Sequence, residues 1–319
     1  MKIETRRKMF QLVCPKSKEK IFKTRIQKMW QLEVLFLLTL YLILAVPLYS
    51  AGPATFITID VPGADQTAAM GINPEGEIVG WSWNLGGVDH GFLLSKGGLT
   101  EFDFQGAYTD PWDINPAREI VGWYLDSSFV PQGFLLSKGV FSTIEFPGAY
   151  STLAFGINPQ GDIVGRYFDS SDSVNNNLSH GFLLSKGVFT TIDLPGASGT
   201  AAVGINPSGE IVGAIVDSDN VTHHGYLLSN GRLTSIDFPG ASSTHAYGIN
   251  LKGEIVGIYF DSVGFPHGYL WRNGVYTPID VPGAILTFAQ KINPAGDIVG
   301  FSVDNDFFHA HGFLLSRGN

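Results

Sequence analysis

The sequence predicts an all-β fold, a six-bladed β-propeller whose blades have four strands each. The first observation is that Ile-Val-Gly recurs six times, beginning at Ile78, Ile120, Ile163, Ile211, Ile255 and Ile298. The intervals of 42 to 48 residues match the length of a propeller blade. The second is that each interval holds four short strand-like runs separated by turn residues. The third is the content of 39 glycines, which favours many turns and short strands.

The repeats fill residues 56–319, and each carries four runs, named D, A, B and C in chain order. Their limits are 56–98, 99–140, 141–188, 189–232, 233–275 and 276–319. In the fourth repeat these runs are "FTTIDL", "TAAVGIN", "EIVGAIVD" and "HGYLLS". Run D ends in Pro-Gly, and run C ends in Asn230-Gly231, which suits a two-residue hairpin turn. No run keeps a 3.6-residue apolar period long enough for a helix, and a parallel β-helix fits four hairpin-like runs less well.

The order of runs at the two ends predicts how the ring closes. The repeats begin with a D run at 56–61 and end with a C run at 311–316. The last blade therefore lacks its outer strand, and the N-terminal run is available to supply it. Pairing the two would cover strand edges that otherwise invite aggregation.

Residues 1–51 differ from the repeats and predict export. They hold ten of the 20 Lys and Arg residues, followed by an uncharged apolar run from Val34 to Tyr49 and then small residues. That order is typical of a secretory signal, and a cleaved signal is favoured over an uncleaved anchor. We therefore expect an extracellular, periplasmic or cell-surface protein, which touches a membrane only through this segment.

Charge and cysteine content exclude several function classes for the repeats. Residues 51–319 hold 10 basic against 26 acidic residues, a poor match for nucleic acid, whose phosphates need Lys and Arg. Cys14, the single cysteine, lies in the basic leader. The repeats therefore cannot form disulfides, thiolate metal sites or a cysteine nucleophile.

The repeat pattern is similar to the bacterial extracellular HAF repeats. The shared features are A-x-G-I-N-x-x-G-x-I-V-G, then H-G-F-L-L and S-K-G, over residues 56–319. Glycine replaces the alanine of the His-Ala-Phe stretch at Gly91, Gly181, Gly225, Gly268 and Gly312. The resemblance implies an exported repeat protein and carries no agreed activity.

Histidine opens run C in five repeats, with Gln132 in the second. Antiparallel runs B and C place an aspartate from the end of B opposite this histidine, so we expect structural Asp–His pairs that fix the B–C loops. The pairs are Asp169–His180, Asp217–His224, Asp261–His267 and Asp304–His311. A metal site or a catalytic pair is the alternative, which Gln132 and the spread of the copies around a ring argue against.

Other recurring polar residues are expected to serve the blade. An asparagine precedes each A–B turn, where it can bond its own backbone. Acids begin run B at Glu77, Glu119, Asp162, Glu210, Glu254 and Asp297. A second ring of acids on run D is expected to be solvated or turn-bonding: Asp60, Asp103, Glu145, Asp193, Asp237 and Asp280.

Two departures from the repeat concern the channel and calcium. Asp113 and Lys291 replace the glycine of "GIN", and we expect them to meet at the channel mouth as a solvated pair of little energetic worth. Asp217-Ser218-Asp219 resembles a set of calcium ligands but lacks the EF-hand spacing. No cofactor is therefore predicted, with calcium as the less favoured alternative.

A binding site must depart from the sixfold repeat, and exposed aromatic residues stack on sugar rings or anchor peptides. B–C loops and D–A turns share one face of a propeller. On this face we predict ligand contacts at Tyr108, Trp112, Gln132, Tyr150, Phe265, Phe307 and Phe308.

The function predicted is a binding or scaffold propeller that recognises a polysaccharide or a protein through this face. One alternative is a glycan hydrolase or lyase using carboxylates there, and another is a purely structural cell-surface module. An enzyme is the less favoured, because the sequence shows no lone Ser-His-Asp set, phosphate loop or metal motif.

Overall fold

The computed structural model describes residues 55–85, 87, 89–96, 98–105, 108–170 and 178–316. The chain divides into two units, residues 1–50 and 51–319, and every described residue belongs to the second. The segment predicted as signal or anchor lies outside the described residues. Among those that are described, no helix has the length and apolarity needed to cross a membrane.

The described residues form 24 strands, which repeat in the order D, A, B, C. The D strands are β1 (Thr55–Ile59), β5 (Gly98–Phe102), β9 (Val140–Ile144), β13 (Val188–Ile192), β17 (Arg232–Ile236) and β21 (Val275–Ile279). The A strands are β2 (Gln66–Ile72), β6 (Thr109–Ile114), β10 (Ser151–Ile157), β14 (Gly199–Ile205), β18 (Ser243–Ile249) and β22 (Leu286–Ile292). The B strands are β3 (Ile78–Trp83), β7 (Ile120–Leu125), β11 (Ile163–Phe168), β15 (Ile211–Val216), β19 (Ile255–Phe260) and β23 (Ile298–Val303). The C strands are β4 (His90–Ser95), β8 (Pro131–Ser137), β12 (His180–Ser185), β16 (His223–Ser229), β20 (Pro266–Arg272) and β24 (Ala310–Ser316).

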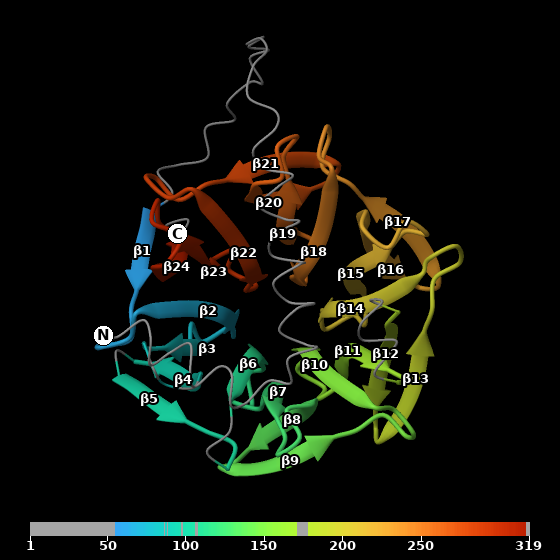
Figure 1. The fold of residues 1–319 in the computed structure, drawn as a ribbon. Helices are drawn as coiled ribbons and strands as arrows, with labels where there is room; N and C mark the ends of the chain where they lie inside the picture. The colour runs from blue at the N-terminus through green and yellow to red at the C-terminus, as the bar shows by residue number, and fades with distance from the viewer. Residues whose placement is uncertain are drawn as a thin grey trace, which may run out of the picture. The chain divides into compact units, whose positions relative to one another are not determined.

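These strands form an all-β propeller of four-stranded blades, as the sequence predicts. Four sheets are separate and have four strands each, in the orders β6 to β9, β10 to β13, β14 to β17 and β18 to β21. An eight-stranded sheet contains two further antiparallel sets, β22–β23–β24–β1 and β2–β3–β4–β5, joined by one parallel pair, Gln66 with Ala310. Figure 1 shows the sheets around a central axis, with the A strands innermost.

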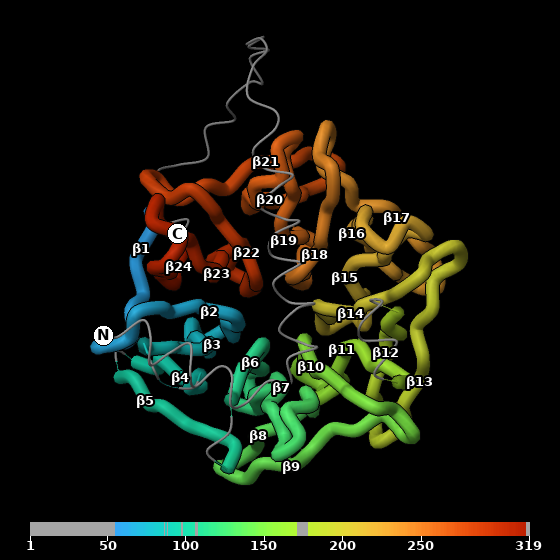
Figure 2. The backbone as a smooth tube through the Cα atoms, in the orientation of Figure 1, coloured from blue at the N-terminus to red at the C-terminus, as the bar shows by residue number. Residues whose placement is uncertain are grey.

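The first and last strands of the described chain pair with each other. Strand β1 runs antiparallel to β24, from Thr55 opposite Ser316 to Ile59 opposite Gly312. The tube in Figure 2 shows this N-terminal strand in blue beside the red C-terminal strands. Phe56 packs edge-on against Phe313, with ring centroids 5.5 Å apart. The N-terminal strand thus supplies the outer strand that the sequence shows to be missing from the last repeat.

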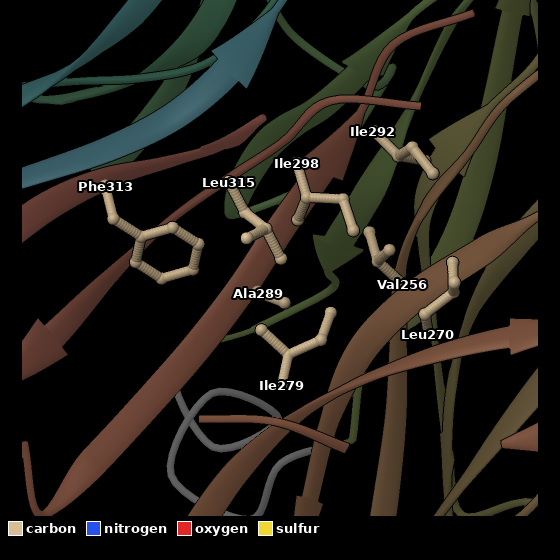
Figure 3. Close-up of a cluster of buried hydrophobic side chains, with 8 residues drawn as sticks. All are labelled: Val256, Leu270, Ile279, Ala289, Ile292, Ile298, Phe313 and Leu315. Carbon is tan, nitrogen blue, oxygen red and sulfur yellow. The ribbon is translucent and has the colours of Figure 1, made fainter. Parts of the chain in front are cut away.

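The Ile-Val-Gly motif explains how neighbouring blades pack. Its valines have no exposed surface: Val79, Val121, Val164, Val212, Val256 and Val299. Val256 on β19 packs against Ile292 and Ile298 of the next blade (Figure 3), and the other valines make the equivalent contact. The glycine is required by close approach, since a Cβ at Gly80 would lie 1.9 Å from the Ala68 carbonyl oxygen. Packing therefore accounts for the isoleucine, the valine and the glycine of the motif.

The asparagine of each A–B turn is buried and bonds beyond its own turn. The Asn206 Oδ1 accepts from the backbone N–H of Ser208 and Glu210, and its Nδ2 donates to the Glu210 carboxylate. The same Nδ2 donates to the Asn250 carbonyl of the next blade at 3.3 Å. Equivalent links run from Asn73 to Asn115, from Asn115 to Asn158 and from Asn250 to Asn293. The turn that the sequence predicts is therefore also a contact between blades.

We expect deletion of residues 55–61 to lower the melting temperature of the chain by about 10 °C. The deletion removes the pairing with β24 and the burial of Ile59 and Val61, and loss of a buried aliphatic side chain costs about 2–5 kcal/mol. Thermal unfolding followed by circular dichroism measures the change. The control is Ile57→Ala, an exposed position on the same strand that should have little effect. An unchanged melting temperature on deletion would show that β1 does not close the ring.

Candidate functional site

A cavity of about 260 Å³ opens among four neighbouring blades. Ser179 and His223, which line it, precede and begin C strands, so it lies at the ends of the B–C loops. Its aromatic lining is Trp112, Trp123, Phe155 and Tyr247, and its polar lining is Arg166, Ser179, His223 and His245. Leu153, Ala201, Val203, Ala214 and Val216 complete it. This is the face on which the sequence predicts a binding site.

The cavity exists because one blade carries small side chains where its neighbours carry large ones. Strands β14 and β15 contribute Ala201, Val203 and Ala214. At the position of Val203, the other cavity-lining blades carry Trp112, Phe155 and Tyr247. In the last blade Phe288 stacks on Phe301 at 4.4 Å across the positions of Ala201 and Ala214. The hollow is therefore a departure from the repeat and not a feature that every blade shares.

Among the described residues that line the cavity, Arg166 is the one with a permanent charge. Its guanidinium carbon lies 5.6 Å from the Phe155 ring centroid and 5.2 Å from that of Phe168, within the range of cation–π attraction. Its Nε is buried and has no hydrogen-bond partner among the described residues. Burial lowers the pKa of Arg166, but a guanidinium stays protonated at physiological pH.

Two histidines and a tyrosine stand near this charge. The His223 and His245 rings stack with centroids 4.6 Å apart. Burial, together with the charges of His223 and Arg166, lowers the pKa of His245 to about 3, so this imidazole is neutral. Burial also raises the pKa of Tyr247, which keeps its hydroxyl protonated. The lining therefore combines flat apolar rings with hydrogen-bonding groups and one cation.

Of the seven predicted ligand contacts, only Trp112 lines this cavity. Tyr150, Phe265 and Phe307 are exposed, and Tyr108 and Gln132 are half-buried outside the lining. Phe308 packs edge-on against Trp83, and its carbonyl accepts a hydrogen bond from Gln66 Nε2. These six side chains do not converge on one hollow.

Sequence reasoning missed Arg166 and His245, although comparing the repeats position by position could have found them. The residue after Ile-Val-Gly is Trp81, Trp123, Ala214, Ile258 or Phe301 in the other five repeats. Arginine is therefore the single polar residue in a column that is otherwise apolar.

The predicted Asp–His partners lie close together, but each histidine has a second and nearer aspartate. His224 Nε2 lies 3.3 Å from Asp217, and its Nδ1 lies 3.0 Å from Asp237 on the neighbouring D strand. The Nε2 distances are 3.4 Å for Asp169–His180, 3.6 Å for Asp261–His267 and 3.4 Å for Asp304–His311. The Nδ1 partners of His90, His180, His267 and His311 are Asp103, Asp193, Asp280 and Asp60, at 2.8–2.9 Å.

The acids of run D are mostly exposed, as the sequence predicts, but the structure gives them histidine partners that the sequence analysis did not expect. Five of them pair with histidine, because C and D strands are adjacent and antiparallel. The pair His311–Asp60 joins β24 to the end of β1, so it also ties the two ends of the ring. In the part of the chain that the structure describes, no group of three or more His, Cys, Asp or Glu side chains could hold a metal ion.

Asp113 and Lys291 meet, but the expectation of a solvated pair is wrong. Asp113 is 8% exposed and Lys291 is 5% exposed, and Lys291 Nζ lies 3.5 Å from Asp113 Oδ2. The ammonium also donates to the carbonyls of Phe155, Val203 and Tyr247, at 3.0, 2.8 and 3.2 Å. Those three residues line the cavity with their side chains. The inner strands approach so closely that this pair is buried between them.

The chain is similar in fold to solved β-propellers. No protein-family model matches the sequence, and comparison with curated proteins gives no match either. The Aleuria aurantia lectin, described as a six-bladed β-propeller with a fucose recognition mode, has a TM-score of 0.52 at 15% identity, over 82% of this chain and 95% of that chain. A putative TolB from Agrobacterium tumefaciens has a TM-score of 0.53 at 12% identity, over 78% and 90%. At these identities the likeness shows the fold alone.

The stability of the protein should fall as the pH rises above about 6.5, in part through His224. Burial by itself would lower the pKa of His224, but the hydrogen bond and charge of Asp237, with Asp217, outweigh it and raise this pKa. A raised folded-state pKa adds stability that is present below the unfolded value of about 6.5 and is lost as pH rises through the folded value. Urea unfolding at several pH values should show a smaller fall for His224→Gln, which copies Gln132. Identical pH slopes for the two proteins would contradict this role.

Asp113→Gly and Lys291→Gly should each destabilise the protein by about 3–5 kcal/mol, because each leaves a buried charge without its partner. The double variant restores the glycine of the other four repeats. It should lose much less unfolding free energy than the two single variants lose together. A double-mutant cycle from urea unfolding measures the coupling. Additivity within about 0.5 kcal/mol would mean that the two charges do not stabilise each other.

Proposed function

We propose that the protein is an exported, six-bladed, HAF-type propeller that binds a polysaccharide through the cavity on its B–C loop face. In this proposal residues 1–51 direct export, and the eight-stranded sheet counts as two blades. The observation that carries it is the asymmetric cavity walled by Trp112, Trp123, Phe155 and Tyr247. A protein partner and a purely structural module are the alternatives.

The chemistry of the walls favours a sugar. Indole and phenol rings present flat apolar faces with a polar edge, which suits the stacking of sugar rings. Small-molecule sites usually occupy about 300–1,000 Å³, so a cavity of about 260 Å³ takes a small group such as one sugar unit. The fucose-binding lectin among the similar folds supports a sugar ligand on such a scaffold, although a shared fold does not decide it.

A pair of carboxyl groups is what favours the glycan hydrolase alternative. Burial raises the pKa of Asp110 well above its usual value, and burial also raises the pKa of Asp89. Asp110 Oδ1 has no hydrogen-bond partner among the described residues. Neither carboxyl group lines the cavity, however, and a hydrolase needs two carboxylates at the bound glycosidic bond.

Ala214→Trp should abolish sugar binding while the protein remains folded. Tryptophan occupies the aligned positions Trp81 and Trp123, so the backbone accepts it, and here its ring would fill the cavity. Glycan arrays followed by calorimetry on the best ligand should show a loss of at least about tenfold in affinity. The control is Leu233→Trp, an exposed position on β17 of the same blade, which should bind as the wild type does.

The same experiment separates the alternatives. If the wild-type protein binds no glycan on the array, the sugar proposal is contradicted. The protein partner and the structural module then remain as the alternatives. Release of new reducing ends from a bound glycan would replace the binding role with hydrolysis.

A further inference from the structure

Arg166 is an unusual residue for this strand position, because it is half-buried and its Nε is fully buried. Moving a guanidinium out of water without a counter-ion is costly, and buried arginine is ordinarily paired with a carboxylate. The described residues offer Arg166 no such pair, and none of those that line the cavity is acidic. The repeat does not require a cation at this position, because alanine, isoleucine, tryptophan and phenylalanine fill it elsewhere.

The surroundings hold the guanidinium in place without neutralising it. The rings of Phe155 and Phe168 lie within cation–π distance, which offsets part of the desolvation cost. The nearby His223 and His245 supply no negative charge, and neither does the protonated Tyr247. The cavity thus has a fixed positive charge that the described residues leave without a counter-ion, and apolar walls around it.

We propose that the cavity selects an acidic saccharide, a sugar ring that carries a carboxylate or a sulfate ester. The anionic group pairs with Arg166, while the ring lies against the aromatic walls formed by Trp112 and Tyr247. This inference rests on the proposed sugar-binding function and adds the charge of the ligand to it. An oxyanion supplies the acceptors that the described residues lack, and guanidinium binds carboxylate and sulfate with paired hydrogen bonds.

The test uses the full chain and matched sugars that differ only in the group at C6, which is neutral or anionic. The probes are the methyl glycosides of glucose, galactose and mannose, the corresponding uronic acids, and the 6-sulfates of the same three sugars. Isothermal titration should give at least one acidic member that binds about tenfold or more tightly than its neutral counterpart, equivalent to ~1.4 kcal/mol. Whether the uronic acid or the sulfate binds more tightly identifies the source of the negative charge.

Variants of Arg166 then assign the preference. Arg166→Met should remove the preference, so that the acidic sugar and its neutral counterpart bind with affinities within about twofold of each other. Arg166→Lys should keep part of it, because the charge remains and the paired geometry is lost. Arg232→Met removes the same charge from an exposed position on β17 and should leave the preference unchanged.

A second measurement guards against simple misfolding. Without ligand, Arg166→Met should melt at the same temperature as the wild type or higher, because it replaces a half-buried charge that has no counter-ion among the described residues with an apolar side chain. A loss of preference together with a lower melting temperature in both Arg166 variants would overturn the assignment to the charge.

The outcomes distinguish the two proposals. If neutral and acidic sugars bind equally and Arg166→Met changes neither, the acidic preference is wrong and sugar binding stands. If none of the nine probes binds and a glycan array is silent as well, the proposed function fails and the acidic preference fails with it.

Discussion

The packing of each Ile-Val-Gly valine against two isoleucines of the next blade is the contact on which the rest of the structure depends. Val256 with Ile292 and Ile298 is one instance. Because a blade buries this face only against its neighbour, no blade is complete alone, and the chain must return to its start. The pairing of β1 with β24 meets that requirement, and His311–Asp60 adds a polar tie at the same place. The repeated residues are therefore explained by packing and closure before any function is considered.

The residues that serve this contact are the ones that make the fold predictable from sequence. A side chain present in every repeat meets the same neighbours in every blade, so one interpretation applies six times. The strands, the Asn turns and the pairing of the first and last strands follow in this way. The second aspartate at each histidine was harder to predict, since Asp237 faces His224 across the adjacent strands C and D and not across the B–C loop. A pattern along the chain shows which residues recur but not which of two acids lies nearer.

The candidate site was predictable only in its location. Its face follows from propeller topology. The cavity itself forms because β14 and β15 carry the small side chains of Ala201 and Ala214, which leave room between the blades. A search for exposed aromatic residues favours loop positions such as Phe265 and Phe307, whose side chains face solvent. The aromatic residues that form the walls are partly or wholly buried, three on inner A strands and Trp123 on the B strand β7, where a sequence pattern assigns them to the core. The cavity is a property of several blades together and has no motif of its own.

Lys291 connects the scaffold to this site. Its ammonium is held by Asp113 and by the carbonyls of Phe155, Val203 and Tyr247. These three residues lie on β10, β14 and β18, and all three line the cavity. Fixing these carbonyls fixes the inner strands from which the aromatic walls project, and a ligand site gains affinity when its walls are ordered before binding. Both charges replace glycine, so both break the repeat, as Arg166 does. These three departures from the repeat thus form two neighbouring groups, a buried pair that orders the walls and a cavity whose cation has no counter-ion among the described residues.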